Sequence, residues 1–127
     1  MKSLLLDANI FLRFFLNDVP NQQKIATKLL QQAKNKKLNL IVPQIIIFEV
    51  EFILSKYYLF SKNEIIDRLQ SIVSVAYLDV QDREIFQRAL GIFKNENLSL
   101  VDCFLKAMSE IAETEIFTFD QKLAKLN

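Results

Sequence analysis

The sequence predicts an α/β fold, a three-layer α/β/α sandwich with a central parallel sheet of four or five strands. Short apolar runs of strand length alternate along the chain with longer segments whose apolar residues recur at helical spacing, which is typical of βα units. The strand-like runs are apolar at consecutive positions, as expected of parallel strands covered on both faces. With 127 residues, we expect a single domain over 1–127.

Local signals predict each element in chain order. Strands are expected over 2–6, 38–42, 75–80 and 115–119. Helices are expected over 8–17, from 20 to about 33, from 43 to about 58, from 61, around 85–93, from 99 to about 112, and at the C-terminal end. Pro20 and Pro43 suit the first turn of a helix, and Ser61 with Glu64 has the spacing of a capping box. Asn95 to Asn97 interrupts the helical pattern.

Composition removes several classes of chemistry. The chain has no His, which excludes a Ser-His-Asp or Cys-His site and any His-ligated metal. Its single Cys excludes a disulfide framework and a cysteine zinc site, and its single Gly excludes the Gly-rich phosphate-binding loops. Carboxylates, amides, hydroxyls, Lys and Arg remain. Catalysis should therefore depend on Asp and Glu, together with a metal ion that prefers oxygen ligands.

The charge balance says little about partners. Sixteen basic and fifteen acidic residues give a net charge of +1, which mildly disfavours a dedicated nucleic-acid-binding module but not an enzyme. Asp7 interrupts the apolar N-terminal run, and no stretch approaches the roughly 18 apolar residues of a membrane span. We therefore expect a cytoplasmic protein with no membrane partner.

Four carboxylates lie inside apolar runs, where an unpaired charge would be costly to bury. They are Asp7, Glu49, Asp102 and Asp120. Asp7 and Asp120 follow predicted strands, and Asp102 falls in the first turn of a predicted helix. Ligand sites of open α/β sheets collect at the carboxyl edge of the strands, so these acids are the candidate site.

Glu49 competes with Glu51, because two residues at i and i+2 cannot share a helix face. Gln44, Glu51, Ser55 and Tyr58 follow one polar stripe. That stripe explains Glu51 as a surface residue and leaves Glu49 among apolar neighbours. The sequence therefore favours Glu49 as the functional acid.

Each acid also has a simpler structural explanation. Asp7 and Asp120 could cap the helices that follow them, and Asp102 stands at the capping-box position after Ser99. Glu49 could pair with Lys56. Four converging carboxylates would repel one another without a cation, and Mg²⁺ or Mn²⁺ would remove that repulsion.

The same residues resemble a known family. The carrying segments are Asp7 to Arg13, Val42-Pro43 leading to Phe48-Glu49-Val50, Leu100 to Cys103, and Thr118-Phe119-Asp120. In order and context they look like a PIN domain, and within that superfamily they most resemble the VapC-type toxins of prokaryotic toxin–antitoxin pairs. The resemblance covers essentially the whole chain.

The resemblance implies an endoribonuclease dependent on Mg²⁺ or Mn²⁺, usually a homodimer, inhibited in toxin members by a small antitoxin protein. Asp7, Glu49, Asp102 and Asp120 would be its catalytic and metal-binding acids. Asn9 and Thr118 match the polar residues that accompany the first and fourth acids. The family often has Thr where this chain has Ala8, which removes one supporting hydrogen bond. The implied products carry 5′-phosphate and 3′-hydroxyl ends.

Basic and aromatic residues near these motifs have two interpretations each. Arg13, Lys106 and Lys122 are candidate contacts to RNA phosphates, or ordinary solvated side chains. The predicted helix 8–17 is apolar on nearly every side, with Phe11, Phe14 and Phe15 among its residues. Part of it either faces a partner or lies deep in the core.

Other functions stay open at this stage. A haloacid-dehalogenase-like phosphohydrolase would need a second Asp where this chain has Asn9, which argues against it. A non-toxin PIN-domain nuclease of RNA processing fits the same acids. A catalytically silent PIN-like binding module would be expected to lose acids, and this chain keeps all four.

Overall fold

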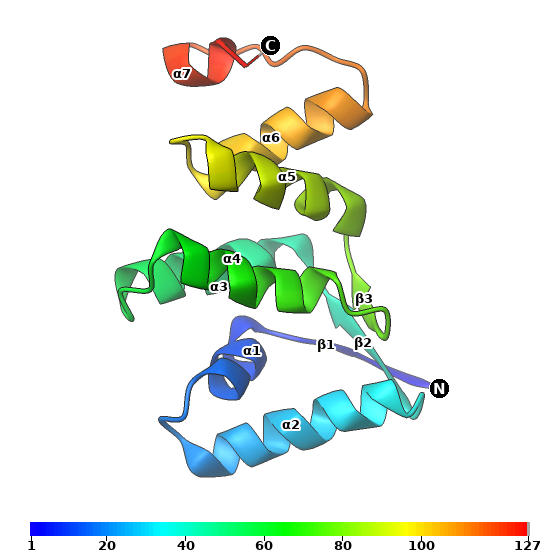
Figure 1. Ribbon diagram of the computed structural model, residues 1–127. Coiled ribbons are helices and arrows are strands. Elements are labelled where there is room, and N and C mark those ends of the chain that lie inside the picture. The colour runs from blue at the N-terminus through cyan, green and yellow to red at the C-terminus, as the bar shows by residue number, and fades with distance from the viewer. Residues whose placement is uncertain (127) are drawn as a thin grey trace. The chain divides into compact units, whose positions relative to one another are not determined.

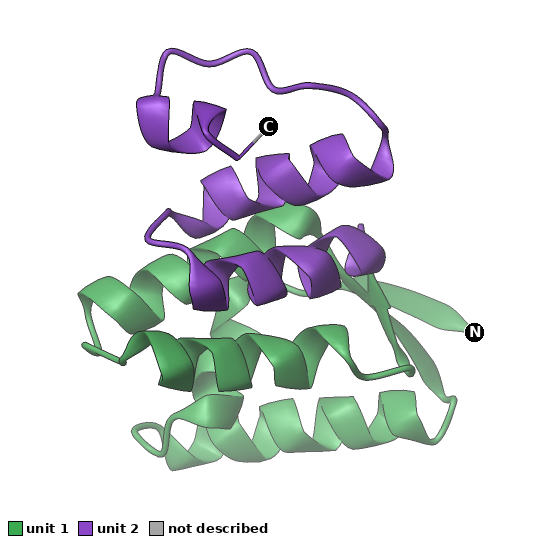
Figure 2. Ribbon diagram, turned by 45° about the horizontal axis from the view of Figure 1, so that its top comes forward, with its two compact units in different colours: residues 1–81 green, residues 82–127 purple. Residues whose placement is uncertain are grey.

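The computed structural model describes residues 1–126 and divides the chain into two compact units (Figure 2). Unit 1 is Met1–Gln81 and unit 2 is Asp82–Asn127. The single domain expected over 1–127 stays a prediction. Within residues 1–126, no helix combines the length and the apolar character needed to cross a membrane.

Unit 1 contains a parallel sheet and its connecting helices (Figure 1). Its elements are β1 (Lys2–Leu5), α1 (Ala8–Phe15), α2 (Pro20–Lys34), β2 (Leu38–Val42), α3 (Gln44–Lys56), α4 (Lys62–Val73) and β3 (Leu78–Val80). The strands pair in the order β1-β2-β3, and both pairings are parallel. Helix α2 packs beside β2 and α4 beside β3, while α1 contacts both α2 and α3. These contacts confirm the α/β class and the parallel sheet.

The register of the sheet separates a buried face from a polar one. Leu40 pairs with Leu4 on one side and with Leu78 on the other, and Leu40 and Leu78 are buried. On the opposite face, the side-chain amide of Asn39 donates to Ser3 Oγ at 3.3 Å and to Asp79 Oδ2 at 3.5 Å. Within unit 1 the sheet is therefore buried on one face, whereas the sequence predicts burial on both. The three-layer arrangement concerns both units together and stays a prediction.

The residues that predict helix starts in unit 1 lie at or next to the observed starts. Pro20 is the first residue of α2, where its missing N–H breaks no hydrogen bond. Pro43 is the N-cap of α3. It therefore lies one residue before the first turn of the helix, and not within that turn as the sequence predicts. The capping box of α4 forms in full: Ser61 Oγ accepts from the Glu64 N–H at 3.2 Å, and Glu64 Oε1 accepts from the Ser61 N–H at 2.9 Å.

The regular elements that the structure describes in unit 2 are helices. Its elements are α5 (Arg83–Asn95), α6 (Leu100–Ile111) and α7 (Gln121–Ala124). Helices α5 and α6 pack together around Phe86 and Phe104, whose ring centroids lie 4.8 Å apart. Ser99 caps α6 by accepting the Asp102 N–H at 3.1 Å, as its position predicts.

The predicted sheet has too many strands. The structure contains three, and the third begins at Leu78 rather than at residue 75. Residues 75–77 form a turn, in which the Leu78 N–H donates to the Val75 carbonyl at 3.2 Å. The strand predicted over 115–119 is not present either. The described part of unit 2 contains no strand that could pair with it, and an unpaired strand has no ladder to hold it extended.

Candidate functional site

Asp7 lies just after β1 and caps α1. Its Oδ1 accepts the backbone N–H of Asn9 at 3.0 Å, so the capping explanation describes a real contact. The carboxylate is exposed, and its Oδ2 accepts no hydrogen bond from residues 1–126. The cap therefore orients Asp7 and leaves one oxygen available to a ligand.

Glu49 lies on the exposed side of α3. The opposite side of the helix is anchored in the core by Ile47, Val50 and Leu54. The alternative ion pair with Lys56 is not formed, because the Lys56 Nζ lies over the Phe52 ring, 5.3 Å from its centroid. Among the described residues, the Glu49 carboxylate has no hydrogen bond and no ion pair. A rigid helix thus presents an unpaired carboxylate.

The burial of Glu49 and Glu51 is the reverse of what the sequence predicts. Glu49 shares its face with Ile45 and Phe52, and these two apolar side chains are exposed. Glu51 is half-buried, and this burial raises its pKa above the ordinary value. The prediction that the two acids lie on different faces is confirmed, and Glu49 has the apolar neighbours that the sequence predicts, but it is exposed rather than buried. The case for Glu49 rests on its motif and its free carboxylate.

Asp102 lies in the first turn of α6, beside the buried Cys103 and Phe104. Its backbone N–H donates to Ser99 Oγ at 3.1 Å. Its carboxylate does not accept the Ser99 N–H in return, so the capping box is incomplete. That carboxylate is half-buried and has no hydrogen bond or ion pair within residues 1–126. Capping therefore explains the backbone of Asp102 and not its side chain.

Asp120 caps the short helix α7. Its Oδ1 accepts the Leu123 N–H at 3.0 Å, while its own N–H donates to Thr118 Oγ1 at 3.0 Å. Thr118 thus holds the backbone that carries the acid. The Asp120 carboxylate is exposed, and these hydrogen bonds together with the buried Leu123 of α7 position it.

The three predicted phosphate contacts have different surroundings. Arg13 Nη1 donates to both carboxylate oxygens of Asp18 at 3.0 Å, and its Nη2 donates to the Tyr58 hydroxyl at 3.4 Å. The hydrogen bond to Tyr58 is the main reason why the pKa of Arg13 is raised. These contacts tie Arg13 of α1 to Asp18 and to Tyr58 at the end of α3, and its contact to RNA stays a prediction. Lys106 is half-buried and Lys122 is exposed, both in unit 2.

The carboxylates can supply the oxygen ligands that a hard divalent cation prefers. Unit 1 contributes Asp7 and Glu49, and unit 2 contributes Asp102 and Asp120. Neither unit by itself brings together three side chains that could hold a metal ion, within the described residues. The unpaired carboxylates of Glu49 and Asp102 nevertheless fit such an ion, because they have no other charge partner there.

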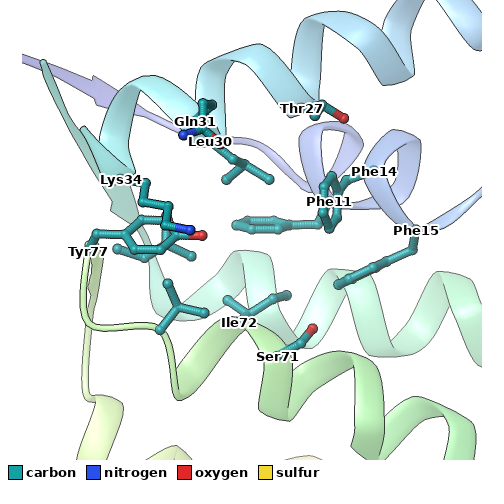
Figure 3. A pocket seen from close by; sticks show the side chains of 12 residues that line it. Phe11, Phe14, Phe15, Thr27, Leu30, Gln31, Lys34, Ser71, Ile72 and Tyr77 are labelled. Carbon is teal, nitrogen blue, oxygen red and sulfur yellow. The ribbon is translucent and has the colours of Figure 1, made fainter. Parts of the chain in front are cut away.

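A cavity of about 270 Å³ lies beside α1 in unit 1 (Figure 3). Phe11, Phe14 and Phe15 of α1 line one side of it. Lys34 and Tyr77 line the other side. Phe11 is buried, whereas Phe14 is 39% exposed. Helix α1 is therefore largely a core helix with one partly exposed side, and whether that side faces a partner stays a prediction.

Comparison with known proteins identifies the family. The family model of the PIN domain matches residues 4–127, which is nearly the whole chain. No curated protein matches the sequence. The match includes all four candidate acids.

Proposed function

The chain belongs to the PIN domain family, and from this premise we propose that it is an endoribonuclease dependent on Mg²⁺ or Mn²⁺. We further propose that it is the toxin of a type II toxin–antitoxin pair and acts in the cytoplasm. PIN domains are generally nucleases, so the family supports phosphodiester hydrolysis as the reaction class. The substrate, the metal and the toxin role are the finer parts of the proposal.

One observation carries the catalytic part of this proposal. Glu49 and Asp102 sit on helices anchored in the core, yet their carboxylates have no partner within residues 1–126. A carboxylate that is half-buried, as that of Asp102 is, is normally paired or capping, while the exposed Glu49 is singled out by its motif. Carboxylates held in place but left unpaired suit a role toward a ligand.

The proposed chemistry assigns a task to each acid. Asp7, Glu49, Asp102 and Asp120 would hold the divalent cation, which supplies Lewis-acid polarisation of the phosphodiester and a more acidic water when bound. The Asn9 N–H fixes one oxygen of Asp7, and the Leu123 N–H fixes one oxygen of Asp120. Each of these two acids thus keeps a defined orientation with one free oxygen. Arg13, Lys106 and Lys122 remain candidate contacts to substrate phosphates.

The cavity beside α1 supports the proposed antitoxin partner. Its lining is largely apolar, Phe14 is partly exposed there, and Lys34 is the only charged residue that lines it in the described chain. An apolar side chain next to an acidic group would suit this lining. We propose that the antitoxin inserts such a segment, and that the toxin is a homodimer as the resemblance implies.

Replacing Asp7 by Asn tests the catalytic proposal. With Mg²⁺ or Mn²⁺, the wild-type chain should cleave RNA, whereas Asp7→Asn or an excess of chelator should abolish cleavage and leave the circular dichroism spectrum unchanged. Full activity of Asp7→Asn would overturn the site. A generic phosphomonoester tested in parallel separates a nuclease from a phosphohydrolase, and failure to cleave any RNA would favour a silent binding module.

Expression in a bacterial host tests the toxin role. We expect growth arrest with the wild-type chain, none with Asp7→Asn, and rescue by a co-expressed neighbouring gene. RNA cleavage in vitro without growth arrest would instead indicate a PIN-domain nuclease of RNA processing.

A further inference from the structure

Two exposed aromatic rings and a lysine lie at the C-terminal end of α3. Phe52 is 50% exposed and Tyr57, the C-cap of the helix, is 66% exposed. Their ring centroids are 6.2 Å apart, with an angle of 83° between the ring planes. The Lys56 Nζ lies 5.3 Å from the centroid of Phe52 and 5.8 Å from that of Tyr57. We call Phe52, Lys56 and Tyr57 the aromatic platform.

The aromatic platform shares a helix face with Glu49. Glu49 and Phe52 stand at i and i+3, and Phe52 and Lys56 at i and i+4, so the three side chains follow one another along the helix surface. All three are exposed. The platform therefore begins within one helical turn, about 5.4 Å, of the proposed catalytic acid.

No ion pair balances the Lys56 charge within the described residues. The ammonium has no carboxylate partner among residues 1–126 and is held only by the two rings. A half-exposed ring also gains little from hydrophobic burial. An exposed ring next to an unpaired cation is the combination with which proteins bind single-stranded nucleic acid, since the ring stacks on a base and the cation contacts the phosphate.

A second copy of the chain would suit this surface less well. Protein interfaces are enriched in aromatic residues but depleted in Lys, because a desolvated ammonium needs a partner. The acid on the same exposed face of α3 is Glu49, and our proposed function gives that acid to the metal. RNA instead supplies the phosphate that Lys56 lacks.

We propose that the aromatic platform binds single-stranded RNA and positions it for cleavage, with a base stacked on Phe52 or Tyr57 and a backbone phosphate at Lys56. This inference rests on RNA being the substrate, as proposed above. It makes Phe52, Lys56 and Tyr57 positioning residues, since none of them acts on the reacting bond.

Binding of RNA in the presence of a chelator tests the platform separately from catalysis. The probe is a fluorescein-labelled uridine octamer, followed by fluorescence anisotropy with the full chain. Phe52→Ala should weaken binding by about 5- to 150-fold, the range for losing one stacked base. Tyr57→Ala should weaken it in the same range. Lys56→Gln should lower the slope of log affinity against log salt by about 0.7.

Matched variants make the test specific. Phe52→Tyr keeps a stacking ring and should bind like the wild type, and Lys56→Arg should keep the salt slope. Ile25→Ala and Lys28→Ala remove an exposed apolar residue and an exposed lysine of α2, and should not change the affinity. A duplex of the same length should bind more weakly, because its bases offer no open faces.

The outcomes separate this inference from the proposed function. Binding that depends on the platform without any metal-dependent cleavage would support the platform and contradict the nuclease. Cleavage with unchanged affinity and KM in both Phe52→Ala and Tyr57→Ala would overturn the platform and leave the nuclease standing. If the two alanine variants change only the oligomeric state in light scattering, the face is a contact between copies and the inference is wrong.

Discussion

The two units each carry two of the proposed acids but hold them differently. In unit 1, Glu49 sits on a helix of 13 residues whose other side includes fully buried Ile47, Val50 and Leu54. In unit 2, Asp120 follows residues 114–118, which have no regular secondary structure, and caps a helix of 4 residues. Local hydrogen bonds and one buried residue of α7, Leu123, hold Asp120, whereas several buried residues hold Glu49.

Glu49 and Asp120 illustrate two ways in which a fold can position a functional side chain. Hydrogen bonds at a helix start are individually worth about 1 kcal/mol, while burying a large apolar side chain is worth about 1.5–3 kcal/mol. Glu49 therefore has a fixed place set by several core residues. Asp120 has an orientation set by Thr118 and the Leu123 N–H.

The largest expected effect is the difference in RNA cleavage between substitutions of Glu49 and of Glu51, the two acids of α3. Glu49→Gln should lower the rate of metal-dependent RNA cleavage by at least about 100-fold, because even residues that only support metal ligands cost 10–100-fold when replaced. Glu51→Gln should leave cleavage within about threefold of wild type. Initial rates at saturating Mg²⁺ measure both. Loss of activity in Glu51→Gln alone would assign the functional role to the half-buried acid.

The second prediction concerns the core of unit 2. Phe86→Ala removes a fully buried ring that contacts Phe104 and should lower the free energy of unfolding by about 3–5 kcal/mol. All three tyrosines belong to unit 1 and there is no Trp, so tyrosine fluorescence follows unit 1 while circular dichroism follows the whole chain.

If residues 1–127 form the expected single domain, the two signals should keep one common urea midpoint in Phe86→Ala. Leu40→Ala, in the sheet of unit 1, is the matched control and should shift both signals together. Separate midpoints in Phe86→Ala would show that the units unfold independently and would contradict the single-domain prediction.

The third prediction separates capping from catalysis at Asp7. Serine is as good an N-cap as aspartate, so Asp7→Ser should keep the stability of the wild type within about 0.5 kcal/mol, whereas Asp7→Ala should lose about 1 kcal/mol. Both variants should lose cleavage. Urea unfolding and cleavage assays on the same preparations measure the two effects. An active Asp7→Ser would show that Asp7 only caps α1.

The smallest effect is the pH dependence at Glu51. Burial raises its pKa above the ordinary 4.5, so the unfolded chain loses this proton at a lower pH than the folded chain does. The carboxylate therefore destabilises the fold as the pH rises above 4.5, and it has no such effect below that pH. Glu51→Gln should be more stable than wild type at pH 7 and equally stable near pH 4, as measured by urea unfolding. An equal difference at both pH values would exclude this titration.

Much of the fold could be predicted from local sequence. The strand Leu38–Val42 and the starts of α2, α4 and α6 lie where Pro20, the Ser61 capping box and Ser99 place them, because these signals act within one helical turn. The prediction of a strand over 115–119 is wrong, because an apolar run forms a strand only when another strand pairs with it. The sequence analysis does not predict the aromatic platform, although the i, i+4 spacing of Phe52 and Lys56 is a local signal for it.

The sequence by itself determined the available chemistry: without His and with one Cys, only oxygen ligands remain, and four acids in motif order mark the family. The tertiary structure determines which of those acids are left without a hydrogen bond or ion pair among the described residues. It paired Arg13 with Asp18, buried Glu51 instead of Glu49, and left the carboxylates of Glu49 and Asp102 without partners among the described residues. The reason is that composition and spacing are properties of the chain, whereas burial and pairing depend on which helix faces meet the core.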